Sequence, residues 1–141
     1  MNFSQIYSKK VLEHIRHPRN MGEIKNPDGV ATVGNLVCGD IMRLYIKIEK
    51  KDGKDYIKDA KFQTLGCGAA ISTSSIITTM VKGKPLNEAE KITNQAIAEA
   101  LGGLPASKTH CSVLAAEALR KAIENYRKKL KSVSKTKKQN I

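Results

Sequence analysis

Three cysteines are the residues of this 141-residue chain whose types and spacing could do chemistry. Each lies at an expected joint between secondary-structure elements, within Val37-Cys38-Gly39, Gly66-Cys67-Gly68 and His110-Cys111-Ser112. A single free cysteine is most often a small buried hydrophobe, but joints between elements are where sites are usually built. Gly39, Gly66 and Gly68 remove Cβ bulk, which would let a bulky inorganic ligand approach the main chain. Together the three thiols indicate a site for a soft metal.

Cys67 and Cys111 also stand at the starts of two predicted helices. Unpaired amides and the positive end of the helix dipole favour a thiolate there, and the thiolate is the form that binds a soft metal. Asp40 lies two residues beyond Cys38, and His110 directly precedes Cys111. Asp40 is also an ordinary turn residue and His110 an ordinary helix cap. Beside three thiols, however, the carboxylate or the imidazole could complete a fourth metal position.

The spacing of the cysteines narrows the kind of metal site. Between Cys38 and Cys67 lie 28 residues, and between Cys67 and Cys111 lie 43, with no Cys-x-x-Cys pair. This excludes a local zinc knuckle. Three sulphurs with a weaker carboxylate or imidazole indicate a group that can be exchanged, whereas permanent electron carriers usually use four cysteines. Zinc held by sulphur, nitrogen and oxygen remains the chemical alternative.

Length and composition predict one domain, over residues 1–131, with an apolar share of 40% that can bury a modest core. No apolar run approaches the roughly 20 residues that cross a bilayer, so we expect no membrane partner. The first ten residues are polar and do not resemble a secretory signal. An odd number of cysteines in such a chain fits a reducing compartment, and we expect a cytoplasmic protein.

The net charge of +12 is concentrated near the end of the chain. Residues 127–138 contain seven Lys or Arg and no acid, which leaves +5 for everything before them. Residues 132–141 lack apolar periodicity, so we predict a disordered, solvated basic tail. A nucleic-acid-binding module is the alternative, but only Tyr126 could stack on a base nearby, and we therefore expect no nucleic acid.

Alternating hydrophobicity predicts a small antiparallel sheet of three strands. The first strand is expected over residues 30–37, the second over 41–49 and the third over 56–65. The second should bury Met42, Leu44, Ile46 and Ile48 and expose Arg43, Tyr45, Lys47 and Glu49. Asp52-Gly53 has the chemistry of a hairpin turn. The third strand alternates at Tyr56, Ala60 and Phe62.

Helical periodicity predicts helices in the segments that precede and follow these strands in the sequence. A first helix of about four turns should be capped by Ser4 and stopped by Pro18, with a stripe of Phe3, Tyr7, Val11 and Ile15. Three helices follow the sheet, after Gly68, over residues 93–101 and from Cys111 to about Leu130. The predicted inward faces are Ala69, Thr73, Ile76, Ile77 and Met80 in the first of these, and Ala115, Ala118, Leu119, Ala122, Ile123 and Tyr126 in the last. Strands followed by helices predict an α+β fold with helices on one face of the sheet.

A thiol enzyme with His110 as base and Cys111 as nucleophile is a further alternative. We do not favour it, because neighbouring residues at a helix start should point their side chains apart, whereas such pairs normally converge from distant positions. The residues thus indicate a carrier rather than a catalyst.

Four segments in order make the chain resemble the U-type iron–sulphur scaffold family, IscU and the N-terminal domain of NifU. They are His17-Pro18-Arg19-Asn20-Met21-Gly22, Gly34-Asn35 leading to Cys38-Gly39-Asp40, residues 62–71 (FQTLGCGAAI), and Leu101-Gly102-Gly103-Leu104-Pro105 leading to His110-Cys111-Ser112. The resemblance covers residues 7–126. It implies assembly of a 2Fe-2S cluster from iron and sulphur, with the sulphur delivered as persulphide by a cysteine desulfurase of IscS or NifS type, and transfer of the cluster to apoproteins.

By that resemblance, Cys38, Cys67 and Cys111 are cluster ligands, Asp40 keeps the cluster labile, and His110 is an alternative fourth ligand. Lys108 matches the family's lysine beside the last ligands and would support sulphur transfer. Zinc in the cluster-free form, as a zinc-bound sulphur acceptor for the desulfurase, is the alternative within this chemistry. The oligomeric state, a homodimer included, stays open.

The segment 104–108 departs from the family pattern. The family's chaperone-recognition stretch is Leu-Pro-Pro-Val-Lys, and here the residues are Leu-Pro-Ala-Ser-Lys. Loss of the second proline and the valine counts against release through a dedicated Hsp70-type chaperone. The presence of His110 favours the IscU or NifU branch over the related SufU type.

Overall fold

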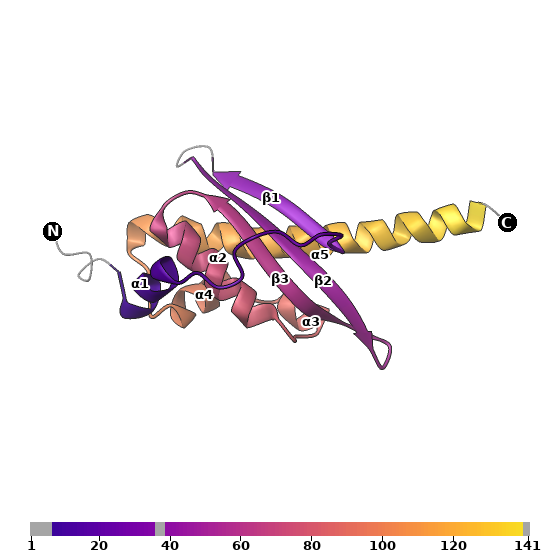
Figure 1. The fold of residues 1–141 in the computed structure, drawn as a ribbon, viewed down its shortest axis with the longest axis horizontal. Coiled ribbons are helices and arrows are strands. Elements are labelled where there is room, and N and C mark those ends of the chain that lie inside the picture. The colour runs from indigo at the N-terminus through magenta and orange to yellow at the C-terminus, as the bar shows by residue number, and fades with distance from the viewer. Residues whose placement is uncertain (1–6, 36–38, 140–141) are drawn as a thin grey trace.

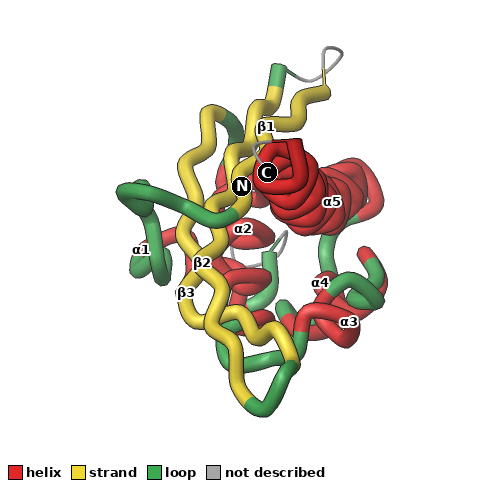
Figure 2. The backbone as a smooth tube through the Cα atoms, turned by 90° about the vertical axis from the view of Figure 1, so that its right-hand side faces the viewer, coloured by secondary structure: helices red, strands yellow, loops and turns green. Residues whose placement is uncertain are grey.

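The computed structural model describes residues 7–35 and 39–139, with the backbone alone for Asn35 and for residues 132–139. Three antiparallel strands form one layer, and helices α2 (Gly68–Val81) and α5 (Thr109–Gln139) pack on it, as Figures 1 and 2 show. The predicted α+β fold, a three-stranded sheet with helices on one face, is confirmed.

The sheet follows the chain in the order β1 (Gly29–Asn35), β2 (Asp40–Lys51), β3 (Lys54–Leu65). Asp52 and Gly53 turn the β2–β3 hairpin with positive φ angles of 53° and 79°, which confirms the predicted turn. Of the residues predicted for the first strand, 36 and 37 lie outside the described residues.

A bulge corrects the predicted alternation of the third strand. The β2–β3 register shifts between Lys47 and Ile48, so that Lys58 is the extra residue on β3. Ile57 consequently enters the core with Ala60 and Phe62, whereas Tyr56, predicted for that face, is only half-buried. The regular period of two could not indicate this shift.

The core lies between the sheet and the helices. Ala31, Val33, Met42, Leu44 and Ile46 reach it from β1 and β2, and all six residues predicted for the inward face of the last helix are buried. Tyr45, predicted to be exposed, is 6% exposed, and its hydroxyl donates to Gln63 Oε1 at 2.8 Å. Ile48, predicted to be buried, is only half-buried at the bulge.

Helix α1 (Lys9–Arg16) is shorter than predicted and begins later. Ser8, not Ser4, is the N-cap, and its Oγ accepts from the Val11 amide at 3.1 Å. The helix ends before Pro18 as expected and packs against α2. Phe3 and Ser4 lie outside the described residues.

Helix α2 contacts α1, α4, α5 and the sheet, so it is buried on more sides than a single stripe predicts. Ser72, Thr73, Ser74 and Ser75 are all buried, whereas Ile76 and Met80 of the predicted inward face are only partly so. The hydroxyls of residues 72–74 donate to backbone carbonyls three or four residues earlier. Hydroxyls bonded in this way can be buried at little cost, and hydrophobicity alone does not register them as core residues.

Two short helices connect α2 to α5. Helix α3 (Leu86–Ala89), which we did not predict, follows Pro85 and buries its two terminal residues. Helix α4 (Asn94–Ala100) confirms the prediction for residues 93–101: Thr93 caps it, and Gly102 and Gly103 end it with φ angles of 77° and 101°. A short 3₁₀ helix, η2 (Ala106–Lys108), leads into α5.

Helix α5 continues to Gln139, past the predicted end near Leu130, and in Figure 1 its last part extends beyond the sheet. No glycine or proline occurs between Cys111 and the end of the chain to stop it. The division of the chain at residue 131 into a domain and a disordered tail stays a prediction. Among the described residues, no helix is both long and apolar enough to cross a membrane.

Candidate metal centre

The predicted site residues meet where three elements begin. Asp40 is the first residue of β2, Cys67 is the N-cap of α2, and His110 and Cys111 lie in the first turn of α5. The antiparallel β2–β3 pairing places the start of β2 beside the end of β3, and Cys67 follows that end by two residues. Cys38 lies outside the described residues, so its place in this group stays a prediction.

Asp40, His110 and Cys111 bring an oxygen, a nitrogen and a sulphur together. Asp40 Oδ2 lies 3.0 Å from His110 Nε2 and 3.8 Å from Cys111 Sγ, and the latter two atoms are 3.4 Å apart. All three candidate ligand atoms fall within 4.8 Å of one another. One ion could contact all three after small side-chain rotations, since metal–ligand distances are about 2.0–2.3 Å.

Cys67 adds a second sulphur at the edge of this group. Its Sγ lies 3.9 Å from Cys111 Sγ, and both thiols are free. Its backbone amide donates to Asp40 Oδ1 at 3.4 Å, so the carboxylate contacts the starts of both α2 and α5. Asp40 is 5% exposed, and a buried carboxylate requires such partners.

The electrostatics correct one expectation about the thiols. Burial and the neighbouring Cys67 raise the pKa of the Cys111 thiol, so the helix start does not by itself favour a thiolate there. Desolvation is the largest cause, because Cys111 is fully buried, and the nearby Cys67 and Asp40 raise the pKa further. A bound cation would reverse this balance, since metal coordination deprotonates a thiol.

Lys108 and Tyr7 are half-buried and interact electrostatically with Cys67. Attraction to Cys67 raises the pKa of Lys108, and burial together with Cys67 raises the pKa of Tyr7. Tyr7 packs with Ala69 and Cys111 in a small apolar cluster. Sequence reasoning placed Tyr7 only in a helical stripe, and nothing in that periodicity distinguishes a residue beside the site from one in the core.

The glycines around the site serve protein packing more than ligand approach. A Cβ at Gly66 would lie 2.5 Å from Asp40 Oδ1, and one at Gly68 would lie 2.7 Å from Ile15 Cδ1 of α1. Only Gly39, with φ of 73° and nothing within 4 Å of its Cβ position, leaves open space. We predicted that Gly66 and Gly68 let a ligand approach the main chain, but the structure shows that they allow close packing against Asp40 and Ile15.

His110 and Cys111 do not point apart as predicted, because the imidazole Nε2 and Sγ are 3.4 Å apart. The same nitrogen also faces Asp40, so both side chains turn toward one shared point rather than forming an isolated base and nucleophile. This convergence of unlike donors is typical of a metal site.

A family model described as the NifU-like N terminal domain matches residues 6–133 of the chain. The chain belongs to this family. The resemblance inferred from the motifs is thus confirmed, and residues 40, 67, 108, 110 and 111 all lie within the matched part.

The chain is also similar to individual proteins from three organisms. The chain is 58% identical over 132 residues to iron-sulfur cluster assembly scaffold protein IscU 1 of Archaeoglobus fulgidus, covering 94% of this chain and 84% of that protein. It is 49% identical over 121 residues to nitrogen fixation protein NifU of Azotobacter chroococcum, covering 86% of this chain and 38% of that protein. The crystal structure of a NifU-like N-terminal protein from Brucella abortus shares the fold, with a TM-score of 0.66, 21% identity, and coverage of 90% of this chain and 98% of that one.

Proposed function

We propose that this chain is a scaffold on which an iron–sulphur cluster is assembled and from which the cluster is passed on. The observation that carries this proposal is the meeting of Asp40, His110 and Cys111, with Cys67 Sγ 3.9 Å from Cys111 Sγ. Family membership supports it, because curated relatives carry the name of cluster assembly scaffold protein. A scaffold holds and releases its cargo, so the role is that of a carrier rather than a catalyst.

The donor set suits a cluster that must leave. Thiolates of Cys67 and Cys111, with Cys38 as a third, are soft ligands for iron, whereas the carboxylate of Asp40 is a harder and weaker one. Asp40 and His110 compete for the remaining position, because each faces the same point of the site. We take the cluster to be 2Fe-2S because the family resemblance implies it; three thiolates and one further ligand would fill the four ligand positions of such a cluster.

Sulphur would reach the site from a cysteine desulfurase as a persulphide. A thiolate of the scaffold attacks the outer sulphur, the donor's S–S bond breaks as the new one forms, and the donor leaves as a thiolate. Conversion to sulphide then takes two electrons from an external reductant such as a thiol. Lys108, whose ammonium is attracted to Cys67, is placed to stabilise anionic sulphur during this step.

Anaerobic incubation with ferrous iron, cysteine, a cysteine desulfurase and a thiol reductant tests the function. We expect visible sulphur-to-iron charge-transfer bands, together with about two irons and two sulphides per cluster, as 2Fe-2S stoichiometry requires. A protein that stays colourless and retains one zinc under these conditions would instead be a zinc-bound sulphur acceptor.

Replacing Asp40 by alanine should slow the release of the cluster. The exchangeable carboxylate is lost, and the site closes on thiolate and imidazole ligands, so we expect transfer to an apo-ferredoxin to slow by about tenfold. The measurement is the rate at which the circular dichroism of the acceptor's cluster develops after mixing.

Asp59→Ala is the matched control, because Asp59 is a β3 carboxylate in an exposed ion pair with Lys82, remote from the thiols. It should transfer its cluster at the unmodified rate. Equal rates for Asp40→Ala and Asp59→Ala would remove the proposed role of Asp40.

A further inference from the structure

A basic groove runs between residues 120–131 of α5 and the segment that joins α3 to α4. It has a volume of about 620 Å³ and is lined by Glu90, Lys91, Arg120, Glu124, Arg127, Lys128 and Lys131. His110 and Cys111 lie in the first turn of α5, whereas the groove lies further along this helix, which Figure 1 shows in full. The 17 residues from His110 to Arg127 correspond to about 25 Å along the helix axis.

The groove has a surplus of three positive charges, from five cations and two carboxylates. Arg127 pairs with Glu90, and Lys128 pairs with Glu124 at 3.0 Å. All 13 Asp and Glu side chains of the chain belong to residues that the structure describes. None of these carboxylates forms an ion pair with the other three cations of the groove, which are Lys91, Arg120 and Lys131. The groove therefore presents three exposed cations that could pair with carboxylates of another molecule.

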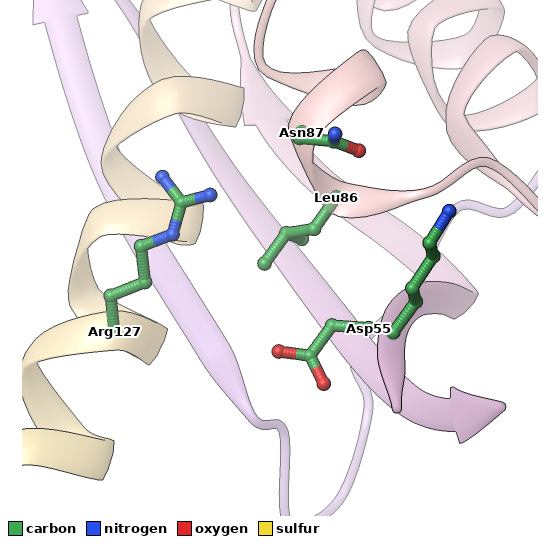
Figure 3. A pocket seen from close by; sticks show the side chains of 5 residues that line it. Asp55, Leu86, Asn87 and Arg127 are labelled. Atoms are coloured by element: carbon green, nitrogen blue, oxygen red, sulfur yellow. The ribbon is translucent and has the colours of Figure 1, made fainter. Parts of the chain in front are cut away.

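A smaller hollow extends this basic surface toward the β2–β3 hairpin. It has a volume of about 230 Å³ and is lined by Lys54, Asp55, Leu86, Asn87 and Arg127. Figure 3 shows Arg127 from α5 facing Leu86 and Asn87 at the start of α3. Because Arg127 lines both hollows, a ligand lying across it would contact cations on either side.

We propose that the basic groove is a docking surface for an acidic segment of a partner protein. Carboxylates spaced along such a segment would pair with Lys91, Arg120 and Lys131, while cations of the partner could approach Glu90 and Glu124. Nucleic acid fits less well: the two carboxylates would repel a phosphate backbone, and no aromatic residue lines the groove for base stacking. The distance from the thiols separates this surface from the cluster site.

Fluorescence anisotropy with a labelled, helix-forming, glutamate-rich peptide tests the proposal on the full-length chain. The groove variant carries Lys91→Glu, Arg120→Glu and Lys131→Glu, and all three positions are exposed. The control variant carries Lys9→Glu, Lys25→Glu and Lys58→Glu, which are also exposed and form no described ion pair. Each triple reversal lowers the net charge by six, from +12 to +6, so general attraction changes equally in both.

At physiological salt we expect the groove variant to lose affinity for the peptide by at least about tenfold, and the control variant by much less. Equal losses in the two variants would show attraction by net charge alone and would overturn the proposal. A single-stranded oligonucleotide of the same charge that binds more tightly than the peptide, and depends on the same three residues, would overturn it in favour of nucleic acid. Cluster assembly should proceed in both variants, so this experiment is independent of the scaffold function.

Discussion

Replacing Cys111 by serine is expected to abolish stable cluster assembly, leaving less than about a tenth of the visible absorbance of the unmodified chain after anaerobic reconstitution. Cys111 Sγ is close to both other kinds of donor in the site, since it lies 3.8 Å from Asp40 Oδ2 and 3.9 Å from Cys67 Sγ. Serine keeps the shape of the side chain, but its hydroxyl is not a soft ligand. Iron and sulphide analysis of the gel-filtered protein checks the result.

Val113→Ser provides a matched control two residues further along α5, where the side chain is 45% exposed and lines no part of the site. It should assemble a full cluster. The far-UV circular dichroism of both variants should remain that of the unmodified chain. Full cluster content in Cys111→Ser would contradict the assignment of Cys111 as a ligand.

Gly29→Ala is expected to destabilise the protein more than alanine at any other glycine of the chain. A Cβ at Gly29 would overlap the backbone carbonyl oxygen of Ala122 and crowd the side chain of Ile46. The contact is with backbone rather than with a flexible side chain, so β1 and α5 must separate. We expect the free energy of unfolding to fall by about 3 kcal/mol, and the melting temperature by roughly 6–12 °C.

Gly34→Ala, in the same strand, is the control for this prediction. Its Cβ would lie 3.4 Å from the Asp40 carbonyl oxygen and 3.7 Å from Ile41, which are ordinary contacts. Its stability should change by less than about 1 kcal/mol, because alanine also reduces the entropy of the unfolded chain. Thermal and urea unfolding measure the stability of both variants. Equal losses of stability would show that β1 and α5 are not in close contact at Gly29.

The sequence predicted the layers of this fold better than its local irregularities. Alternation and turn chemistry located the hairpin at Asp52, and the period of the last helix identified its buried face, because both signals are local. The bulge at Lys58 and the burial of Ser74 depend on tertiary contacts and satisfied hydroxyls, which hydrophobic periodicity does not record. The predicted start of α1 was wrong because the sequence alone does not distinguish Ser4 from Ser8 as the N-cap.

The grouping of the site could be predicted, but its electrostatics could not. Asp40, Cys67 and His110 were selected by residue type and by their place at joints, and the fold brings them to Cys111. The raised pKa of the Cys111 thiol follows from burial, which a helix-dipole argument does not include. The packing role of Gly66 likewise requires knowing that Asp40 lies beside it. The place of Cys38 in the group stays a prediction.

Both oxygens of the Asp40 carboxylate have hydrogen-bond partners within the protein. Oδ2 lies within hydrogen-bonding distance of His110 Nε2, at 3.0 Å, and Oδ1 accepts from the Cys67 amide at 3.4 Å. In the proposed scaffold, iron could therefore leave this oxygen without leaving an unpaired anion in the protein interior, since both hydrogen-bond partners are within reach. These contacts would offset part of the free-energy cost of releasing the cluster.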